Sequence, residues 1–149
     1  MPTVEVQETI QGGADAVYRV LTQMEDFPAL MTNVESVVIR ETGDGYAVSE
    51  WTARLQGRKF HWVERDEFFP QRRQIVFHQL EGDLKVFAGQ WHVDPVTQSQ
   101  SRVTLVTEFE FGIPMLAALL NPVARYALRQ NALGMLTGIQ KAVAGDPPP

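Results

Sequence analysis

Alternation of apolar and polar residues between positions 33 and 111 constrains the fold of this chain most. In this stretch the apolar positions recur at every second residue, in six runs separated by short connections rich in Gly, Asp, Gln and Pro. Side chains with this period point alternately to the two faces of a strand. Runs joined by such short connections pair as antiparallel neighbours. We therefore expect an antiparallel meander with strands at 34–41, 46–55, 58–68, 74–80, 84–93 and 102–111.

One strand and two short helices are expected before the meander. Residues 3–11 have the pattern of a strand, which Gly12–Gly13 end. Residues 14–23 then place their apolar side chains on one stripe of a helix, and residues 27–31 suggest a second short helix with Pro28 in its first turn. The expected sheet therefore has about seven strands.

A long apolar helix is expected after the meander. Residues 122–144 carry only three charged side chains, so this helix must be covered over much of its surface. Apolar and neutral positions at helical spacing include Tyr126 and Gln130. The pattern predicts an α+β fold in a single domain over 1–149, with a core over 3–144 and a flexible tail over 145–149.

Composition excludes several functional classes. The chain has 149 residues and a net charge of −5, and it has no cysteine, so disulfides and thiolate chemistry are excluded. No concentrated basic stripe indicates a nucleic-acid partner. No segment reaches the roughly 18 consecutive apolar residues of a membrane span, and the first residues do not form a signal peptide. A cytoplasmic protein without integral membrane association is expected; its oligomeric state is left open.

Motifs of common enzyme classes are missing as well. Phosphate-binding loops, the dinucleotide-binding glycine pattern, the zinc-protease motif and the serine nucleophile motif do not occur. His61, His78 and His92 have no ligand-spaced partners, so neither a metal nor a cofactor is expected.

The residues Gln56–Gly57 fix the register of one hairpin. If they form a two-residue loop, Trp51 lies directly opposite Trp62 and Ser49 lies opposite Glu64. One face of this hairpin then combines large aromatic side chains with a carboxyl group. The opposite face is charged and polar and is expected to be solvated.

Two carboxyl groups, Glu64 and Asp66, share the face of Trp62 and allow two interpretations. They could serve as an acid–base couple or a polar anchor inside a cavity. Alternatively, the strand runs past the core and its end is in water. The second interpretation is favoured because Asp and Glu are rarely buried unless they are paired.

Large aromatic side chains are spread over the early helices, the meander and the long helix. They could form an ordinary core, or they could line a cavity between a curved sheet and the helix. The candidate ligand-binding residues are Phe27, Met31, Trp51, Phe60, Trp62, Phe77, Gln79, Trp91, Phe109, Tyr126 and Gln130.

The order of the expected elements resembles the helix-grip arrangement of START-like domains. Within that superfamily the chain is similar to the polyketide cyclase/dehydrase and lipid-transport group, which includes coenzyme-Q-binding proteins and aromatase/cyclases. The resemblance covers residues 3–144. It rests on Ala16–Val17–Tyr18 with Leu21, Met24 to Pro28, Glu35–Ser36–Val37, Trp62, and Glu81–Gly82–Asp83 through Gly89–Gln90–Trp91.

This resemblance implies a deep apolar cavity that binds lipids, quinones or polyketides. Aromatase/cyclases of the group are expected to place an arginine in the cavity a few residues after the third-strand tryptophan. Asp66 occupies that position here, and Arg65 and Arg54 have the parity of the outer face. A cavity without a cation suits a neutral ligand better than an anionic polyketide intermediate.

Three functions follow from the resemblance. The first is binding of a small hydrophobic ligand. The alternative is an aromatase/cyclase or dehydratase, with Glu64, Asp66 and Tyr126 as candidate catalytic residues and Gln79, Thr107 and Asn131 as further polar candidates. The third is ribosome association, as in some coenzyme-Q-like relatives, which the acidic composition disfavours.

Overall fold

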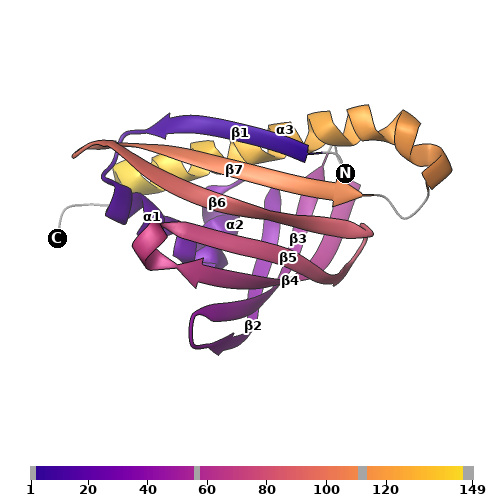
Figure 1. The fold of residues 1–149 in the computed structure, drawn as a ribbon, viewed down its shortest axis with the longest axis horizontal. Coiled ribbons are helices and arrows are strands. Elements are labelled where there is room, and N and C mark those ends of the chain that lie inside the picture. The colour runs from indigo at the N-terminus through magenta and orange to yellow at the C-terminus, as the bar shows by residue number, and fades with distance from the viewer. Residues whose placement is uncertain (1–2, 56–57, 111–113, 146–149) are drawn as a thin grey trace.

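The computed structural model describes residues 3–55, 58–110 and 114–145. Within these residues the chain forms one antiparallel sheet of seven strands in the order β1-β7-β6-β5-β4-β3-β2 (Figure 1). The predicted meander is confirmed, because β2 to β6 each pair with the next strand along the chain, and β1 pairs with β7. The strands are β1 (Thr3–Ile10), β2 (Val34–Gly43), β3 (Tyr46–Leu55), β4 (Arg58–Phe69), β5 (Gln74–Gly82), β6 (Val86–Thr97) and β7 (Gln100–Glu110).

Helices lie on one side of the sheet, behind it in the view of Figure 1. Between β1 and β2 come α1 (Ala14–Thr22), the short 3-10 helix η1 (Met24–Asp26) and α2 (Phe27–Leu30). A second 3-10 turn, η2 (Pro70–Arg72), joins β4 to β5, and α3 (Pro114–Gly145) follows β7. The long helix packs along β1 and also contacts α1 and α2. The helix-grip architecture predicted from the sequence is confirmed.

The long helix begins earlier than predicted. The sequence suggests a start at Pro122, because proline has no N–H for the helix and its ring crowds the preceding turn. The structure instead has one helix from Pro114, with Pro122 inside it. Residues 115–120 are Met, Leu and Ala, which are strong helix formers, so the helix continues across the one lost hydrogen bond.

The hairpin between β6 and β7 is longer than predicted. The sequence suggests a loop over 94–101, whereas the strands extend to Thr97 and begin again at Gln100. A bulge between Pro95 and Thr97 makes this possible, because a bulge tolerates a residue without a backbone N–H. The predicted hairpin turn at 56–57 and the tail residues 146–149 lie outside the described residues.

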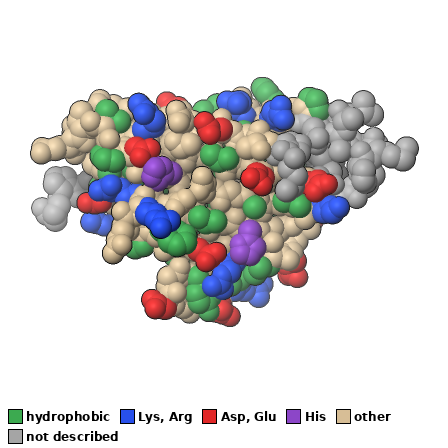
Figure 2. Space-filling model, in the orientation of Figure 1, with side chains coloured by type: hydrophobic (Ala, Val, Ile, Leu, Met, Phe, Trp, Pro, Cys, Tyr) green, Lys and Arg blue, Asp and Glu red, His purple; other side chains and the backbone are tan. Residues whose placement is uncertain are grey.

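The core fills the space between the inner face of the sheet and the helices. Ile10, Val17, Phe27, Phe109 and Ile139 are completely buried there. Figure 2 shows acidic and basic side chains interspersed over the opposite face of the molecule. Within the described ranges, no helix is both long enough and apolar enough to cross a membrane. The cytoplasmic location stays a prediction.

Candidate functional site

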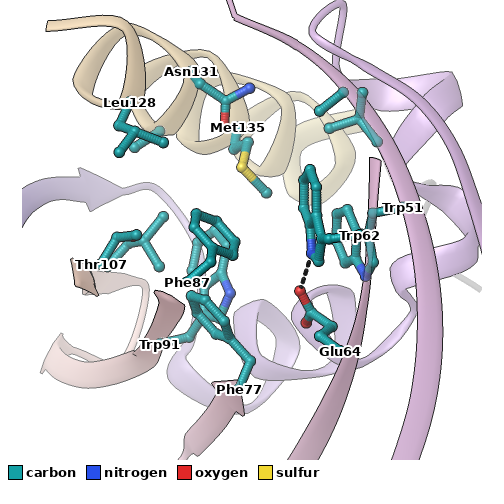
Figure 3. A pocket seen from close by; sticks show the side chains of 14 residues that line it. Trp51, Trp62, Glu64, Phe77, Phe87, Trp91, Thr107, Leu128, Asn131 and Met135 are labelled. Atoms are coloured by element: carbon teal, nitrogen blue, oxygen red, sulfur yellow. Dashed lines mark hydrogen bonds between the residues drawn. The ribbon is translucent and has the colours of Figure 1, made fainter. Parts of the chain in front are cut away.

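A cavity of about 40 Å³ lies between the inner face of the sheet and α3 (Figure 3). Neighbouring strands contribute its aromatic wall, and the helix contributes the facing wall. The described residues that line it are Val34, Trp51, Ala53, Trp62, Glu64, Phe77, Phe87, Trp91, Leu105, Thr107, Leu128, Asn131, Ala132 and Met135.

The aromatic wall is a connected series of ring contacts. Trp51 lies directly opposite Trp62 in the β3–β4 register, which confirms the predicted pairing, and their rings stack with centroids 5.7 Å apart. Trp62 contacts Phe87 at 5.1 Å, and Phe87 contacts Phe77 at 5.7 Å. Phe27 packs its edge on Trp51 at 5.8 Å. The rings therefore run without interruption from α2 to β6.

Gly89 makes room for this wall. It lies between Phe87 and Trp91 on the inner face of β6 and pairs with Phe77 in the sheet. A Cβ atom at this position would lie 2.0 Å from the backbone oxygen of Val106 and 2.8 Å from Cζ of Phe77. Only glycine permits this approach, so the sequence of β6 allows the Phe77 ring to lie across the strand.

A smaller cavity of about 20 Å³ lies next to the first and shares Trp62, Phe87 and Asn131 with it. The connection between β5 and β6 borders the smaller cavity. Side chains take part in two of the hydrogen bonds that hold this connection. The backbone N–H of His61 donates to Asp83 Oδ2 at 2.8 Å, and Gln79 Nε2 donates to the Leu84 carbonyl at 2.6 Å. Two backbone bonds add to them: the N–H of Asp83 donates to the His61 carbonyl, and the N–H of Lys85 donates to the Glu110 carbonyl.

Neither cavity has room for more than a few water molecules. A ligand with a ring therefore needs the two cavities to merge and their walls to move apart. Trp62 and Phe87 belong to both linings and contact each other, so their separation would join the two spaces.

Two carboxyl groups are buried at this part of the sheet, Glu64 in the lining of the larger cavity and Asp66 outside it. Glu64 is 4% exposed and Asp66 is 0% exposed. The interpretation favoured from the sequence, that this strand end is in water, is wrong. The reason is that β4 continues to Phe69 and pairs with both β3 and β5, which places Glu64 and Asp66 in the middle of the sheet.

Hydrogen bonds connect each carboxyl group to a tryptophan. The Trp62 indole N–H donates to Glu64 Oε1 at 2.7 Å, drawn as a dashed line in Figure 3. The Ser49 hydroxyl donates to Asp66 Oδ2 at 2.6 Å, and the Trp51 indole N–H donates to Ser49 Oγ at 2.8 Å. Among the described residues, no N–H or hydroxyl donor reaches the buried Asp66 Oδ1.

The pKa values of both carboxyl groups are raised. Burial raises the pKa of Glu64 well above its usual value, and the neighbouring Asp66 raises it further, against the opposing effect of the Trp62 hydrogen bond. Burial also raises the pKa of Asp66, while hydrogen bonds from Glu64 and Ser49 lower it. When Glu64 is protonated, its acid group can donate a hydrogen bond to the neighbouring Asp66 carboxyl group.

Arginines lie outside the cavity, on the outer face that their parity predicts. The Arg54 guanidinium bonds Glu35 at 2.6 Å, and the Arg65 guanidinium lies 3.9 Å from the centre of the Tyr46 ring. The described lining contains neither Lys nor Arg. Within the described ranges, no group of three His, Asp or Glu side chains is placed to hold a metal ion.

The candidate ligand-binding residues fall into groups according to their depth. The larger cavity is lined by Trp51, Trp62, Phe77 and Trp91, of which Trp62 also lines the smaller one. The smaller cavity is lined in addition by Phe60 and Gln79. Buried behind the walls are Phe27, Met31 and Phe109.

Tyr126 and Gln130 do not lie where the sequence pattern predicts. Tyr126 is 57% exposed, and Gln130 is exposed as well. The stripe of α3 that faces the sheet instead runs through Leu128, Ala132 and Met135. Tyr126 is therefore not a proton donor at this cavity.

Sequence reasoning also missed several lining residues. Phe87 has the strand parity of Trp91, and this parity is the signal that could have found it. Leu128, Ala132 and Met135 follow the i, i+4, i+7 spacing of one helix face, which is the signal that could have found them. Asn131, considered only as a polar candidate, contributes an amide to the facing wall, and its Nδ2 is buried without a hydrogen-bond partner in the described part of the chain.

Comparison with known proteins gives one family match and several similar structures. Residues 10–135 match the family model described as polyketide cyclase / dehydrase and lipid transport. The protein TTHA0849 from Thermus thermophilus is 25% identical, with a TM-score of 0.92 over 99% of this chain and 100% of that one. A comparison with curated protein sequences gives no match.

Two further solved structures share the fold at lower identity. The Zhui aromatase/cyclase from Streptomyces sp. R1128 is 21% identical, with a TM-score of 0.88 over 96% of this chain and 93% of that one. A START superfamily protein from Mycobacterium smegmatis is 13% identical, with a TM-score of 0.81 over 97% of this chain and 99% of that one.

Proposed function

Because this chain belongs to the polyketide cyclase/dehydrase and lipid-transport family, we propose that its cavity binds a small, uncharged hydrophobic ligand with at least one ring. Lipids with a ring, quinones and polyketides belong to this class. The observation that carries the proposal is the wall of Trp51, Trp62, Phe77, Phe87 and Trp91, in which Glu64 is the one titratable side chain of the described lining. Aromatic walls with few polar groups favour ring-shaped apolar ligands.

Charge supports an uncharged ligand. Glu64 and Asp66 are buried acidic groups, and the described lining offers no Lys or Arg to a ligand anion. Where Asp66 is ionised, Coulomb repulsion at an effective dielectric constant of about 20 costs an anionic ligand on the order of 2 kcal/mol. This repulsion corresponds to more than about a tenfold loss of affinity for an anion of the same shape.

Intrinsic fluorescence is a direct test because all three tryptophans of the chain line the cavity. Acetylnaphthalene and naphthoate are a matched pair of probes, a neutral ketone and an anion on the same ring system. We expect acetylnaphthalene to quench the tryptophan emission and to bind at least about tenfold more tightly than naphthoate. Equal affinity for the two probes, or no quenching by either, contradicts the proposal.

Two leucine substitutions on α3 separate cavity binding from surface binding. Ala132 is 4% exposed and lines the cavity, whereas Ala144 is exposed near the end of the same helix. Ala132→Leu fills the space and should weaken acetylnaphthalene binding, while Ala144→Leu should leave it unchanged. Equal binding by both variants would place the probe elsewhere on the protein.

A second candidate function is that of an aromatase/cyclase or dehydratase. The observation that favours it is the buried, proton-holding Glu64 in the cavity wall, because a carboxyl group with a raised pKa can exchange protons near neutral pH. A matched test compares the products formed from a poly-β-ketone by the wild type and by Glu64→Gln. Unchanged product ratios would exclude Glu64 from the chemistry.

A further inference from the structure

The hydrogen-bond network around the acid pair has a fixed direction. An indole N–H can only donate, so Ser49 Oγ must accept from Trp51, and the hydroxyl proton of Ser49 then points to Asp66. In the same way Glu64 Oε1 must accept from Trp62, which leaves Oε2 free to carry the proton of the Glu64 acid. Two series of hydrogen bonds, one from Trp51 through Ser49 and one from Trp62 through Glu64, therefore lead to the Asp66 carboxyl group.

Glu64 lies between the cavity and Asp66. Glu64 belongs to the described cavity lining, whereas Asp66 is fully buried and does not. Asp66 Oδ1 has no other donor among the described residues, and the two carboxyl groups are hydrogen-bonded when Glu64 is protonated. A proton that leaves a ligand can thus reach Asp66 only through Glu64.

We propose that Glu64 and Asp66 form a two-carboxyl proton relay that removes a proton from an uncharged 1,3-dicarbonyl ligand bound in the cavity. This inference rests on the proposed function, because the ligand must first occupy the aromatic cavity. Glu64 is the catalytic residue that touches the ligand. Asp66 is the positioning residue. It accepts the proton that Glu64 releases, and Glu64 can then accept a proton from the ligand.

The relay step balances without any co-reactant. The C–H bond between the two carbonyl groups breaks, and its proton binds the free lone pair of Glu64 Oε1. The Glu64 Oε2–H bond breaks at the same time, and that proton forms a bond to Asp66 Oδ1. The electron pair of the C–H bond stays on the ligand as an enolate. One negative charge moves from Asp66 to the ligand, and nothing is oxidised or reduced.

The facing wall holds a donor for the enolate. Asn131 lines both cavities, and its Nδ2 is buried without a partner in the described part of the chain. A buried donor without a partner is costly, so a ligand oxygen that accepts from it is stabilised. A carboxylate base is weak, which restricts the relay to ligands with an acidic C–H bond. The 1,3-dicarbonyl class meets this requirement, and simple ketones do not.

Benzoylacetone is a suitable probe because it is an uncharged aromatic 1,3-dicarbonyl. Its keto and enol forms differ in ultraviolet absorbance, so their interconversion can be followed directly, and tryptophan quenching reports its binding. General acid–base catalysis contributes about 100-fold or more, and we expect the wild type to accelerate the interconversion by that factor. Glu64→Gln keeps both hydrogen bonds of the acid but cannot relay a proton, so it should bind the probe and lose the acceleration.

Two more variants complete the experiment. Asp66→Asn removes the final acceptor and should also lose the acceleration. Glu67→Gln makes the same change as Glu64→Gln on the same strand, at a position with the parity of the outer face, and should keep it. Should Asp66→Asn fail to fold, the comparison of Glu64→Gln with Glu67→Gln decides the question.

The pH dependence distinguishes a relay from a merely structural role. The relay needs an ionised Asp66 and a protonated Glu64, so the acceleration should rise and then fall as pH increases. The groups that bear on the pair are each other and His78, whose charge acts on Asp66. The larger cavity has no further titratable side chain in its described lining, and the smaller one adds His61 and Asp83.

The outcomes separate the relay from the proposed function. Binding of benzoylacetone with acceleration that both Glu64→Gln and Asp66→Asn abolish supports the relay. Binding without acceleration in the wild type, or full acceleration in Glu64→Gln, overturns the relay and leaves ligand binding intact. No binding of either benzoylacetone or acetylnaphthalene overturns the proposed function, and the relay with it.

Discussion

Replacing Glu64 by Gln should remove a pH dependence from the stability of the fold. The glutamine amide has the shape of the protonated acid: its oxygen can accept from the Trp62 indole as Oε1 does, and its NH₂ group can donate to Asp66 Oδ1. The substitution therefore imitates the proton-bound state of Glu64 at every pH. Near the usual pKa of a glutamate we expect the two proteins to differ in stability by less than about 1 kcal/mol.

The sign of the effect follows from the raised pKa of Glu64. In the unfolded chain Glu64 releases its proton near 4.5, whereas the folded protein retains the proton to a much higher pH. The stabilising contribution of this proton is complete below the unfolded pKa and is lost as pH rises through the folded pKa. Over that window, one proton changes the free energy of unfolding by about 1.4 kcal/mol for each pH unit.

The quantity to measure is the difference between the free energies of unfolding of Glu64→Gln and wild type. Urea denaturation followed by far-ultraviolet circular dichroism gives it between about pH 5 and about pH 8. The difference should grow with pH in favour of the variant. The lowered pKa of Glu35, which Arg54 causes, is common to both proteins and cancels. Glu67→Gln is the control, and parallel stability curves for wild type and Glu64→Gln would refute the reasoning.

Three further substitutions test other contacts. Ser49→Ala removes a hydrogen bond that lowers the pKa of Asp66. The pH at which the acceleration of benzoylacetone interconversion begins to rise should therefore increase. An unchanged pH profile would count against this contact. Phe87→Ala joins the two cavities and should lower the free energy of unfolding in urea by about 3 kcal/mol. Acetylnaphthalene should then bind faster in stopped-flow measurements of tryptophan quenching. An unchanged rate would mean that the contact between Trp62 and Phe87 does not limit entry. Gly138→Ala places a Cβ 2.6 Å from the Leu30 carbonyl oxygen, so stability should fall by about 1–3 kcal/mol, and a neutral result would mean that α2 and α3 can separate freely.

Local patterns determined the parts of the site that were predicted correctly. The register that places Trp51 opposite Trp62 follows from two residues, 56–57, and from the period of two on either side. Ser49 and Glu64 lie opposite each other for the same reason. Such inferences need only the hairpin itself, so no distant part of the chain can change them.

Burial of the acid pair could not be predicted because it depends on non-local pairing. Whether Glu64 and Asp66 lie in water or inside depends on how far β4 extends and on β5 pairing along it. A bulge between Val63 and Glu64 shifts that register and places Gln79 opposite Glu64. Nothing in the sequence of β4 alone marks the bulge.

The phase of α3 was missed for a different reason. The helix is apolar on most sides, so its periodicity is weak, and Tyr126 fits an apolar stripe as well as Leu128 does. The sheet decides the phase by providing an apolar cavity that Leu128, Ala132 and Met135 fill. Tyr126 keeps its hydroxyl in water on the other side.

Infrared spectroscopy of the carboxyl groups near pH 7 tests most directly whether Glu64 and Asp66 share one proton in the cavity wall. A protonated carboxylic acid has a C=O band well separated from that of a carboxylate. The structure predicts such a band in the wild type and in Glu67→Gln, and its loss in Glu64→Gln. A wild-type spectrum without the band, or a band that persists in Glu64→Gln, would contradict the shared proton and the proton relay built on it.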